Sequence, residues 1–461
     1  MITLIDNVLN RVTMYRLVLY YLIFLVAAAV ALSFFGFLPF QPINLLFSLS
    51  VLVSVCWIAN RTLAKLFNVP ANAESLYITA FILALIITPQ PPTRYFAAGS
   101  AFVVWAGVWA MASKYFFAIR RKHIFNPAAF AVALAAFTLN QAASWWVGTA
   151  AMLPFVLFGG LLVARKIARF DLVLSFLAAA CAVTLGPSLA KGAGVLSSAG
   201  QFFADTPILF FAFVMLTEPL TSPPARTPRI LYGAMVGLLF APFLHFGKVY
   251  STPELALLAG NVISYVMSPK ARYLLKLKAK TFLADGIYDF RFTADRRLRF
   301  QPGQYLEWTL RHSRPDSRGN RRYFTIASSA SEPEVRLGVK FYPDASSFKR
   351  SLLAMKPGDE IVASQLAGEF VLPKDKRAKL VFMAGGIGIT PFRSMIRDLL
   401  DHDERRPIAV FYSNRTAPEI VYTEVLEEAR NRLGIETVYT LTDTNGVPPD
   451  WQGGTGRVDA E

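Results

Sequence analysis

Two short runs in the last third of the chain hold residues whose types and spacing could carry chemistry. The first is RRYFTIASS, Arg321 to Ser329, which places a guanidinium, an aromatic ring and a hydroxyl within four positions. The second is MAGGIGITP, Met383 to Pro391, in which an apolar strand enters a glycine turn that could open a helix. Together the two runs predict a flavin site beside a dinucleotide site.

The first run matches the needs of a bound flavin dinucleotide. Such a ligand requires a cation for its pyrophosphate, a flat surface for its ring and a hydrogen-bonding group near the reactive ring nitrogen. Arg322, Phe324 and Thr325 supply these in order, because alternation along a strand sends Arg322 and Phe324 to one face and leaves Thr325 at the edge. Tyr323 and Ser328 could add adenine or phosphate contacts. The alternative is an ordinary strand with a surface arginine.

The stretch VKFYPDASSFKRSL, which follows, favours the flavin interpretation. Ser346, Ser347 and Lys349 are expected near a helix start, where backbone N–H groups and hydroxyls can hold a phosphate. Lys340, in the same stretch, is a further candidate cofactor contact. We therefore expect the phosphate side of the flavin site here.

The second run predicts contacts to a dinucleotide pyrophosphate. Gly385, Gly386 and Gly388 would let the backbone approach the anion at a helix start, and Thr390 with Pro391 would begin that helix. Thr390 is expected near the nicotinamide, as Thr325 is near the flavin ring, and these two are the candidate catalytic residues.

The strand PIAVFYSNR, further on, offers contacts for the adenosine end of the dinucleotide. Its last residues include Ser413 and Arg415, which could hold the ribose or a 2′-phosphate and so favour NADPH over NADH. A solvated arginine at a strand end is the plain alternative.

The composition indicates that much of the chain lies in a membrane. Hydrophobic residues make up 54% of the 461 positions, charged residues 17%, and the mean hydropathy is +0.41. About ten apolar segments precede residue 269. They are Val18–Phe37, Ile43–Ala59, Leu76–Thr88, Tyr95–Ala112, Pro127–Leu139, Trp145–Val163, Leu172–Leu189, Thr206–Leu216, Ile230–Phe246 and Pro253–Met267.

The distribution of positive charge predicts the topology. The net charge is +16, and basic residues gather in alternate loops such as Lys114–Lys122 and Arg165–Arg169, whereas the other loops hold little beyond Arg94, Lys191 and Lys248. Positive charge favours the cytoplasmic side, so both termini are expected in the cytoplasm of a multi-pass protein of the inner (plasma) membrane. The basic balance then indicates membrane lipid as a partner and no nucleic acid.

Cysteine and histidine usage disfavours metal relays. The two cysteines, Cys56 and Cys181, both lie in predicted spans, so neither a cysteine-ligated iron–sulfur cluster nor a disulfide framework is supported. Four histidines are spread over the chain, without the facing pairs that stacked haems require. No metal site is predicted.

Composition changes to that of a soluble protein after Lys270. Alternating apolar positions with turn signals at Asp285–Gly286 and Pro302–Gly303 predict a small antiparallel β-barrel, followed from Ala378 by alternating strands and helices of a parallel α/β sheet. The predicted fold class is therefore multi-domain. Its parts are a polytopic α-helical membrane domain of about ten helices (1–268), an FAD-binding β-barrel domain (269–374) and an α/β nucleotide-binding domain (375–461).

Residues 272 to 461 resemble the ferredoxin–NADP reductase family in RRYFTIASS, PGQY, GEF and GGIGITP. The resemblance implies that the R-x-[YF]-[ST] run binds FAD and that the glycine turn binds the nicotinamide dinucleotide, NADPH or NADH. The chain stops at GTGRVDAE, before the family's later Gly-Pro strand. The α/β domain is accordingly expected to be incomplete at its C-terminus.

The membrane part is similar to the D subunit of Rnf complexes and the B subunit of sodium-pumping NADH:quinone reductase. The likeness lies in ANAESLYITAFILAL, HIFNPAAF and FVMLTEPLTSPP. Family members bind FMN covalently at a threonine, but LNQAAS leaves no room for that loop and Thr149 is a poor substitute, so FMN or riboflavin would bind non-covalently. Two helix breaks are candidate cofactor or quinone contacts: Asn126 and Pro127 in one, and Thr217, Glu218 and Pro219 in the other. Plain helix punctuation is the alternative.

These features predict a membrane-bound flavoprotein oxidoreductase. It would pass electrons from cytoplasmic NAD(P)H through FAD to a quinone, a second flavin or a partner redox protein. One alternative is a haem-linked ferric reductase, which the histidine count disfavours. Another is a membrane transporter or scaffold with a tail that senses redox state.

Overall fold

The computed structural model describes residues 9, 12–67, 73–92, 98–119, 122–190, 192, 194–267, 272–313, 315–316 and 319–456. Several positions that are named above, or that fall in ranges given above, lie outside the described residues: Arg94, Arg120, Arg121, Lys191, Lys270, the predicted boundary at 268–269 and residues 457–461. The chain forms two compact units, Met1–Lys270 and Ala271–Glu461.

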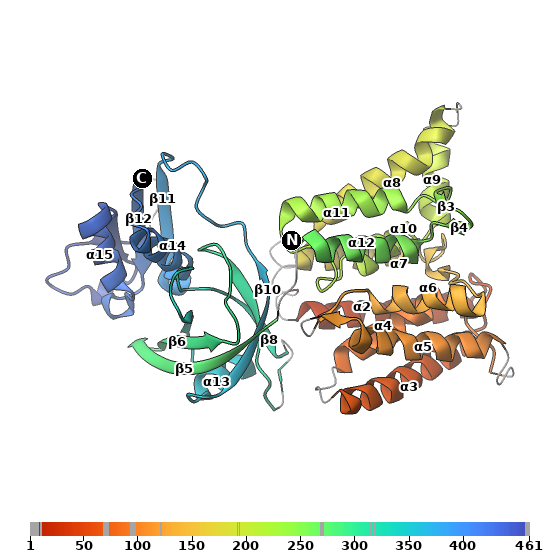
Figure 1. The fold of residues 1–461 in the computed structure, drawn as a ribbon, viewed down its shortest axis with the longest axis horizontal. Helices are drawn as coiled ribbons and strands as arrows, with labels where there is room; N and C mark the ends of the chain where they lie inside the picture. Colours follow the sequence, from red (N-terminus) through yellow and green to blue (C-terminus); the bar gives the residue numbers. More distant parts are fainter. Residues whose placement is uncertain are drawn as a thin grey trace. The chain divides into compact units, whose positions relative to one another are not determined.

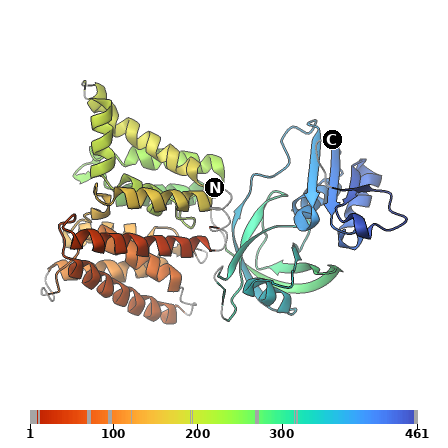
Figure 2. The ribbon, with the colours of Figure 1, turned by 180° about the vertical axis from the view of Figure 1, so that it is seen from behind.

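The first unit is helical, and Figures 1 and 2 show most of its helices aligned along one direction. The helices are α2 (Met14–Phe34), α3 (Pro42–Leu66), α4 (Ala73–Ile86), α5 (Ala98–Phe116), α6 (Pro127–Leu139), α7 (Leu153–Ile167), α8 (Phe170–Ala190), α9 (Val195–Asp205), α10 (Ile208–Phe210), α11 (Arg226–Leu239) and α12 (Pro253–Met267). Short hairpins, β1–β2 (Ala118–Ile119, Lys122–His123) and β3–β4 (His245–Phe246, Val249–Tyr250), interrupt them.

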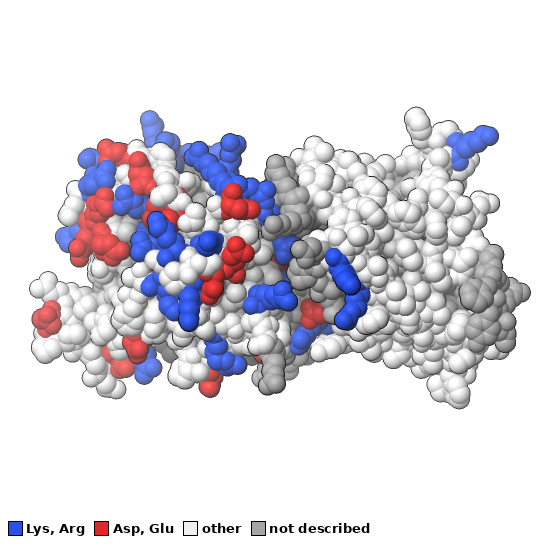
Figure 3. Space-filling model, turned by 60° about the horizontal axis from the view of Figure 1, so that its bottom comes forward, with Lys and Arg blue, Asp and Glu red and all other residues white. Residues whose placement is uncertain are grey.

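Three described helices are long and apolar enough to cross a membrane: Met14–Phe34, Pro42–Leu66 and Phe170–Pro187. A fourth span results if the pair Val195–Asp205 and Ile208–Met215, bent by 67°, is counted as one. The face of this unit seen in Figure 3 is almost entirely uncharged, with its few charged side chains near its ends. An uncharged outer face over apolar helices is typical of a lipid-facing surface.

Some predicted segments are divided differently in the structure. The segment Trp145–Val163 is a 3₁₀ turn, Trp146–Gly148, followed by α7. The segment Thr206–Leu216 consists of α10 and a π-helical stretch, η2 (Phe211–Met215), so it is not a continuous α-helix. Apolar composition alone cannot distinguish an α-helix from a 3₁₀ turn or a π-helical stretch, because all three bury apolar side chains.

The second unit begins with a six-stranded antiparallel sheet, here called the antiparallel lobe. Its strands are β5 (Tyr273–Ala284), β6 (Ile287–Ala294), β7 (Tyr305–Thr309), β8 (Arg321–Thr325), β9 (Val335–Lys340) and β10 (Glu360–Ala367), in the order β8-β7-β10-β5-β6-β9. The predicted Asp285–Gly286 turn joins β5 to β6, with Gly286 at φ +67°. Helix α13 (Ser347–Ala354) packs Phe348 and Leu352 into the core of the lobe.

The rest of the unit is a parallel sheet in the order β11-β12-β13-β14, here called the α/β lobe. Its strands are β11 (Leu380–Gly385), β12 (Ile408–Asn414), β13 (Glu436–Leu441) and β14 (Gly454–Thr455); its helices are α14 (Thr390–Asp401) and α15 (Thr423–Leu433). One face of the sheet packs on α14 and α15 through residues such as Phe382 and Val410. On the other face Val381, Met383 and Val438 stay exposed.

Candidate active site

Strand β8 places the first motif as alternation requires. Its register pairs Arg322 with Trp308 and Phe324 with Leu306, and both partners are fully buried. Arg322 and Phe324 therefore share the core-facing side of the sheet, while Thr325 lies on the opposite side and is paired with Tyr305. Phe324 contacts Phe348 at a ring-centroid distance of 6.0 Å and remains partly exposed.

The start of α13 and the arginine of the first motif lie together. Ser346 caps the helix by accepting the N–H of Lys349 at 3.3 Å, and the Arg322 guanidinium lies 5.3 Å from the Phe348 ring. The Asp316 carboxylate accepts the N–H of Ser347 at 2.9 Å and lies 3.5 Å from Arg322 Nη2. An anion is therefore already held between a guanidinium and a helix N-terminus, which is the environment a pyrophosphate requires.

The remaining candidates around the first motif have different environments. Tyr323 is 53% exposed and donates its hydroxyl to Glu307. Ser328, in contrast, is buried and accepts the N–H of Arg336, so it lies inside the protein and not on an open surface. Two lysines complete the set: Lys340 pairs with Glu419 at 2.8 Å, and Lys349 donates to the Lys340 carbonyl at 2.6 Å.

The glycine turn leaves space for a ligand. A Cβ added at Gly385, Gly386 or Gly388 would meet no atom within 4 Å, and Gly386 has φ +51°, which favours glycine. The turn is a 3₁₀ segment, η3 (Gly386–Ile389), and α14 follows from Thr390 with Pro391 in its first turn. Thr390 itself is buried, and its hydroxyl donates to the Ile387 carbonyl at 3.2 Å.

The end of β12 places Ser413 and Arg415 at the carboxyl edge of the parallel sheet, where ligands of such sheets bind. The side chain of Arg415 is 74% exposed, and its Nε lies 3.6 Å from the Asp443 carboxylate. An exposed guanidinium at this edge can meet a nucleotide phosphate.

The residues present fit both ligands. For FAD the antiparallel lobe brings a guanidinium, an aromatic ring and a helix start together on one side of β8. For the dinucleotide the α/β lobe offers an open glycine turn before α14. Among the residues that the structure describes, no group of three His, Cys, Asp or Glu side chains could hold a metal ion.

The helical unit brings its two helix breaks together. Asn126 caps α6 by accepting the N–H groups of Ala128 and Ala129, and its Nδ2 donates to Glu218 Oε2 at 2.9 Å. The hydroxyl of Thr217 donates back to the Phe213 carbonyl. Pro127 occupies the first turn of α6, and Pro219 follows Glu218 in the other break.

Residues that the sequence did not identify also contact these two helix breaks. His123 Nε2 lies 3.3 Å from Glu218 Oε1, Thr221 donates to Glu218 Oε2 at 3.2 Å, and the Asn126 N–H donates to Asn261 Oδ1 at 2.8 Å. An amide in the middle of an apolar helix was the available signal for Asn261. We refer to His123, Asn126, Glu218, Thr221 and Asn261 as the Glu218 cluster.

The two lobes of the second unit meet through charged residues that the sequence motifs did not include. Arg393 donates to Glu332 and to the Ala327 carbonyl, and Tyr422 donates to Asp289. Arg393 interrupts the apolar side of α14, and an arginine among buried residues was the signal that could have identified it. The contact joins the segment after the first motif to the helix after the second.

Two parts of the chain match known protein families. Residues 382–461 match the family described as oxidoreductase NAD-binding domain, and residues 146–270 match the NQR2, RnfD, RnfE family. The second unit is similar to the reductase components of monooxygenases, and its α/β lobe matches an oxidoreductase NAD-binding domain. In this chain it is fused to a membrane domain of the NQR2, RnfD, RnfE family.

Two of the curated relatives are reductase components of monooxygenases. The chain is 29% identical over 191 residues to the reductase component DmpP of phenol 2-monooxygenase from Pseudomonas sp. (strain CF600), covering 41% of this chain and 53% of the relative. It is 28% identical over 172 residues to the glycine betaine monooxygenase reductase subunit of Pseudomonas aeruginosa, covering 37% and 46%. The chain thus spans about half the length of these relatives.

Among solved structures, the cytochrome P450 reductase GcoB of Amycolatopsis aligns with a TM-score of 0.36. Its sequence identity to this chain is 23%, and the alignment covers 40% of this chain and 55% of GcoB.

Proposed function

We propose that this protein is a membrane-bound reductase that passes electrons from cytoplasmic NAD(P)H through FAD to an acceptor at the membrane. The acceptor is a quinone, a second flavin or a partner redox protein. The observation that carries the proposal is the anion site at Arg322 and the start of α13, in one unit with the open glycine turn before α14. The fused NQR2, RnfD, RnfE domain supports a destination in the membrane.

The residues have separate roles in this proposal. Arg322, Ser346, Ser347 and Lys349 bind the FAD phosphates, Phe324 lies against the ring and Thr325 hydrogen-bonds near it. Gly385, Gly386 and Gly388 admit the pyrophosphate of NAD(P)H. When bound, FAD accepts a hydride from NAD(P)H and releases electrons one at a time. Thr390 and Pro391 begin the helix that positions the nicotinamide side, and Ser413 with Arg415 holds the adenosine end and favours NADPH.

The finer features of the fold belong to the same proposal. The antiparallel lobe is a β-barrel, the membrane domain has about ten helices in contact with lipid, and both termini are cytoplasmic. The Glu218 cluster contacts the acceptor, either a quinone or a non-covalently bound FMN or riboflavin. Its polar atoms at two helix breaks support this role, because irregular backbone at membrane depth is found where it lines a cavity or a site.

The test uses full-length protein and two matched variants. Wild-type protein should contain flavin that NADPH bleaches, and membranes carrying it should reduce quinone analogues. Arg322→Ala should lose both activities, whereas Arg350→Ala, which removes an exposed arginine bonded to the Ala345 carbonyl, should keep both. Equal activity of the Arg322→Ala and Arg350→Ala proteins would refute the assignment of the FAD site.

A further inference from the structure

Five side chains form a closed ring where the two lobes of the second unit meet. Tyr422 donates to Asp289 Oδ1 at 2.9 Å, and Arg336 donates to Asp289 Oδ2 at 2.8 and 3.0 Å. Arg336 also reaches Glu332 at 3.4 Å, Arg393 donates twice to Glu332 at 2.5 and 2.9 Å, and the Arg393 guanidinium lies 5.7 Å from the Tyr422 ring. We refer to these five residues as the lobe-contact ring.

The ring is balanced in charge and its centre is closed to solvent. It contains two guanidinium groups, two carboxylates and a phenol, and Arg393, Asp289 and Tyr422 are each at most 2% exposed. Burial, with the nearby charge of Asp289, raises the pKa of Tyr422 well above its usual value, so the phenol keeps the proton that it donates. Buried ion pairs of this kind add little net stability and serve better to fix one arrangement of the groups.

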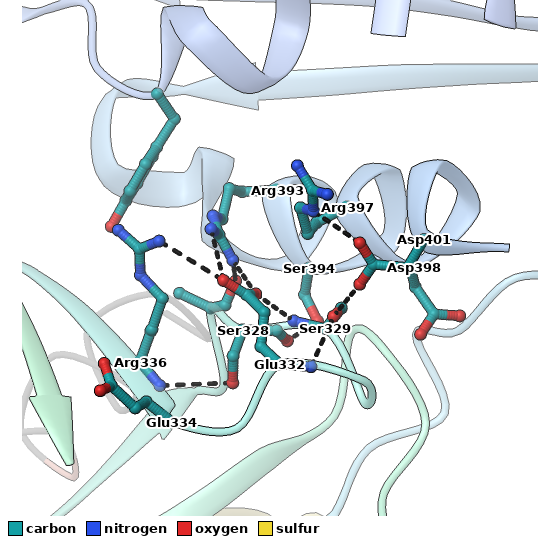
Figure 4. Close-up of polar contacts among 12 residues, drawn as sticks. Ser328, Ser329, Glu332, Glu334, Arg336, Arg393, Ser394, Arg397, Asp398 and Asp401 are labelled. Atoms are coloured by element: carbon teal, nitrogen blue, oxygen red, sulfur yellow. Dashed lines mark hydrogen bonds and ion pairs between the residues drawn. The ribbon is translucent and has the colours of Figure 1, made fainter. Parts of the chain in front are cut away.

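The ring belongs to both lobes and joins their functional segments. Asp289, Glu332 and Arg336 come from the antiparallel lobe, and Glu332 lies in the connection that directly follows the first motif. Arg393 lies one helical turn after Thr390 in α14. Figure 4 shows Arg393 pointing at Glu332, and beside them Ser394 and Asp401 point toward Ser328 and Ser329.

A glycine beside the ring lets the lobes approach closely. Gly338 lies opposite Asp289 in the β6–β9 ladder. A Cβ at this position would lie 2.5 Å from Tyr422 Oη and 2.8 Å from Thr390 Cγ2. The first turn of α14, where the nicotinamide side of the proposed site begins, is therefore held directly against β9.

We infer that the lobe-contact ring is a positioning device, which holds Thr390 and the glycine turn at the distance from the flavin lobe that hydride transfer requires. Glu332, Arg393 and Tyr422 are its positioning residues. The inference rests on the proposed function, because it assigns the ring to the step between NAD(P)H and FAD. Disruption of the ring should therefore misalign the two lobes while both ligands still bind.

The test is rapid-mixing reduction of the flavin by NADPH in the full-length protein. Glu332→Gln should lower the rate at saturating NADPH by about tenfold or more, since a displacement of about 1 Å can cost a hundredfold in rate. Its FAD content and half-saturating NADPH concentration should stay within about twofold of wild type, because no side chain of the ring is assigned a contact to either ligand. Tyr422→Phe, which keeps the ring packing and removes one hydrogen bond, should lower the same rate by a smaller factor.

Arg397 provides the matched control. It lies one turn further along α14 and is also ion-paired, with Asp401 at 2.7 Å and Glu428 at 2.8 Å, but both partners belong to the α/β lobe. Arg397→Lys should leave the saturating rate unchanged, while Arg393→Lys lowers it. A wild-type rate in both Glu332→Gln and Tyr422→Phe would overturn the inference. A wild-type protein whose flavin NADPH cannot reduce would instead refute the proposed function.

Discussion

The lobe-contact ring and the Glu218 cluster are both largely buried groups of polar side chains, yet they differ in composition. The ring pairs two guanidinium groups with two carboxylates. The Glu218 cluster holds one carboxylate between an imidazole and the neutral donors of Asn126 and Thr221. Fixed opposite charges suit a contact that must keep its geometry, whereas an imidazole beside a carboxylate suits a site where protons move. The following experiments test this difference.

The largest effect is expected from Arg393→Ala. This change leaves the Glu332 carboxylate without its closest cation and opens a cavity in a buried contact. We expect the free energy of unfolding to fall by about 3–5 kcal/mol. Hydrogen exchange of α14 and β9 amides in the intact chain measures the loss, because opening of the lobe contact exposes both elements. Unchanged protection would show that the ring does not hold the lobes together.

Glu218→Gln should show that the Glu218 cluster and the lobe-contact ring serve different steps. We expect the flavin to be reduced by NADPH at the wild-type rate, and quinone reduction by membranes to fall by about tenfold or more, because an amide cannot exchange protons as a carboxylic acid does. Glu254→Gln is the control: this carboxylate is also buried in the helical unit, where it accepts Trp145 Nε1 at 3.0 Å. A parallel loss in both variants would assign Glu218 to stability alone.

Asp316→Asn should strengthen FAD binding by up to about tenfold, which corresponds to ~1.4 kcal/mol of binding free energy. The reason is that the Asp316 carboxylate competes for hydrogen-bond donors that the pyrophosphate needs. Titration of the flavin-depleted protein with FAD measures this. Asp359→Asn, which alters a carboxylate bonded to the Lys356 N–H in an exposed turn, should leave the affinity unchanged. Weaker FAD binding in Asp316→Asn would mean that the carboxylate supports the site.

Acid should weaken the lobe-contact ring. Burial alone would raise the pKa of Glu332, but the hydrogen bonds and charge of Arg393, with Ser329 and Arg336, outweigh it and hold the pKa below the usual 4.5. The stabilisation that Glu332 provides is therefore complete above about pH 4.5, and it decreases as the pH falls through the lowered pKa of Glu332 in the folded protein. Thermal unfolding of the wild type and of Glu332→Gln should differ most near neutral pH and converge in acid.

The smallest effect is expected from Arg415→Ala, because its side chain is 74% exposed and exposed charges contribute little. The preference for NADPH over NADH should fall by about two- to fivefold. An unchanged ratio of the two rates would remove Arg415 from the cofactor site.

The sequence predicted the elements whose signals are local. The apolar run before Gly385 is β11, and Thr390 with Pro391 begins α14, because strand alternation and helix-start chemistry act over a few residues. The joining of the Asn126 and Glu218 helix breaks was not predicted, although both breaks were identified as candidates. Each break has a local signal, but the contact between them spans 92 positions.

The lobe-contact ring could not be predicted for the same reason. Asp289 and Tyr422 are 133 positions apart, and the tertiary fold brings β6 and the start of α15 together. The apolar pattern of PEIVYTEVLEEARNRL predicts a helix from Pro418, but Tyr422 adopts φ +62° and α15 begins only at Thr423. The apolar periodicity continues through the turn at Tyr422, so the sequence does not show where the helix begins.

Anaerobic addition of NADPH to purified full-length protein, followed by the flavin absorbance, tests the central claim most directly. We expect bound FAD, bleaching of its absorbance by NADPH, and return of the colour when a quinone analogue is added to protein in lipid. A protein that contains no flavin and takes up no added FAD, or whose bound flavin NADPH does not bleach, would contradict the account.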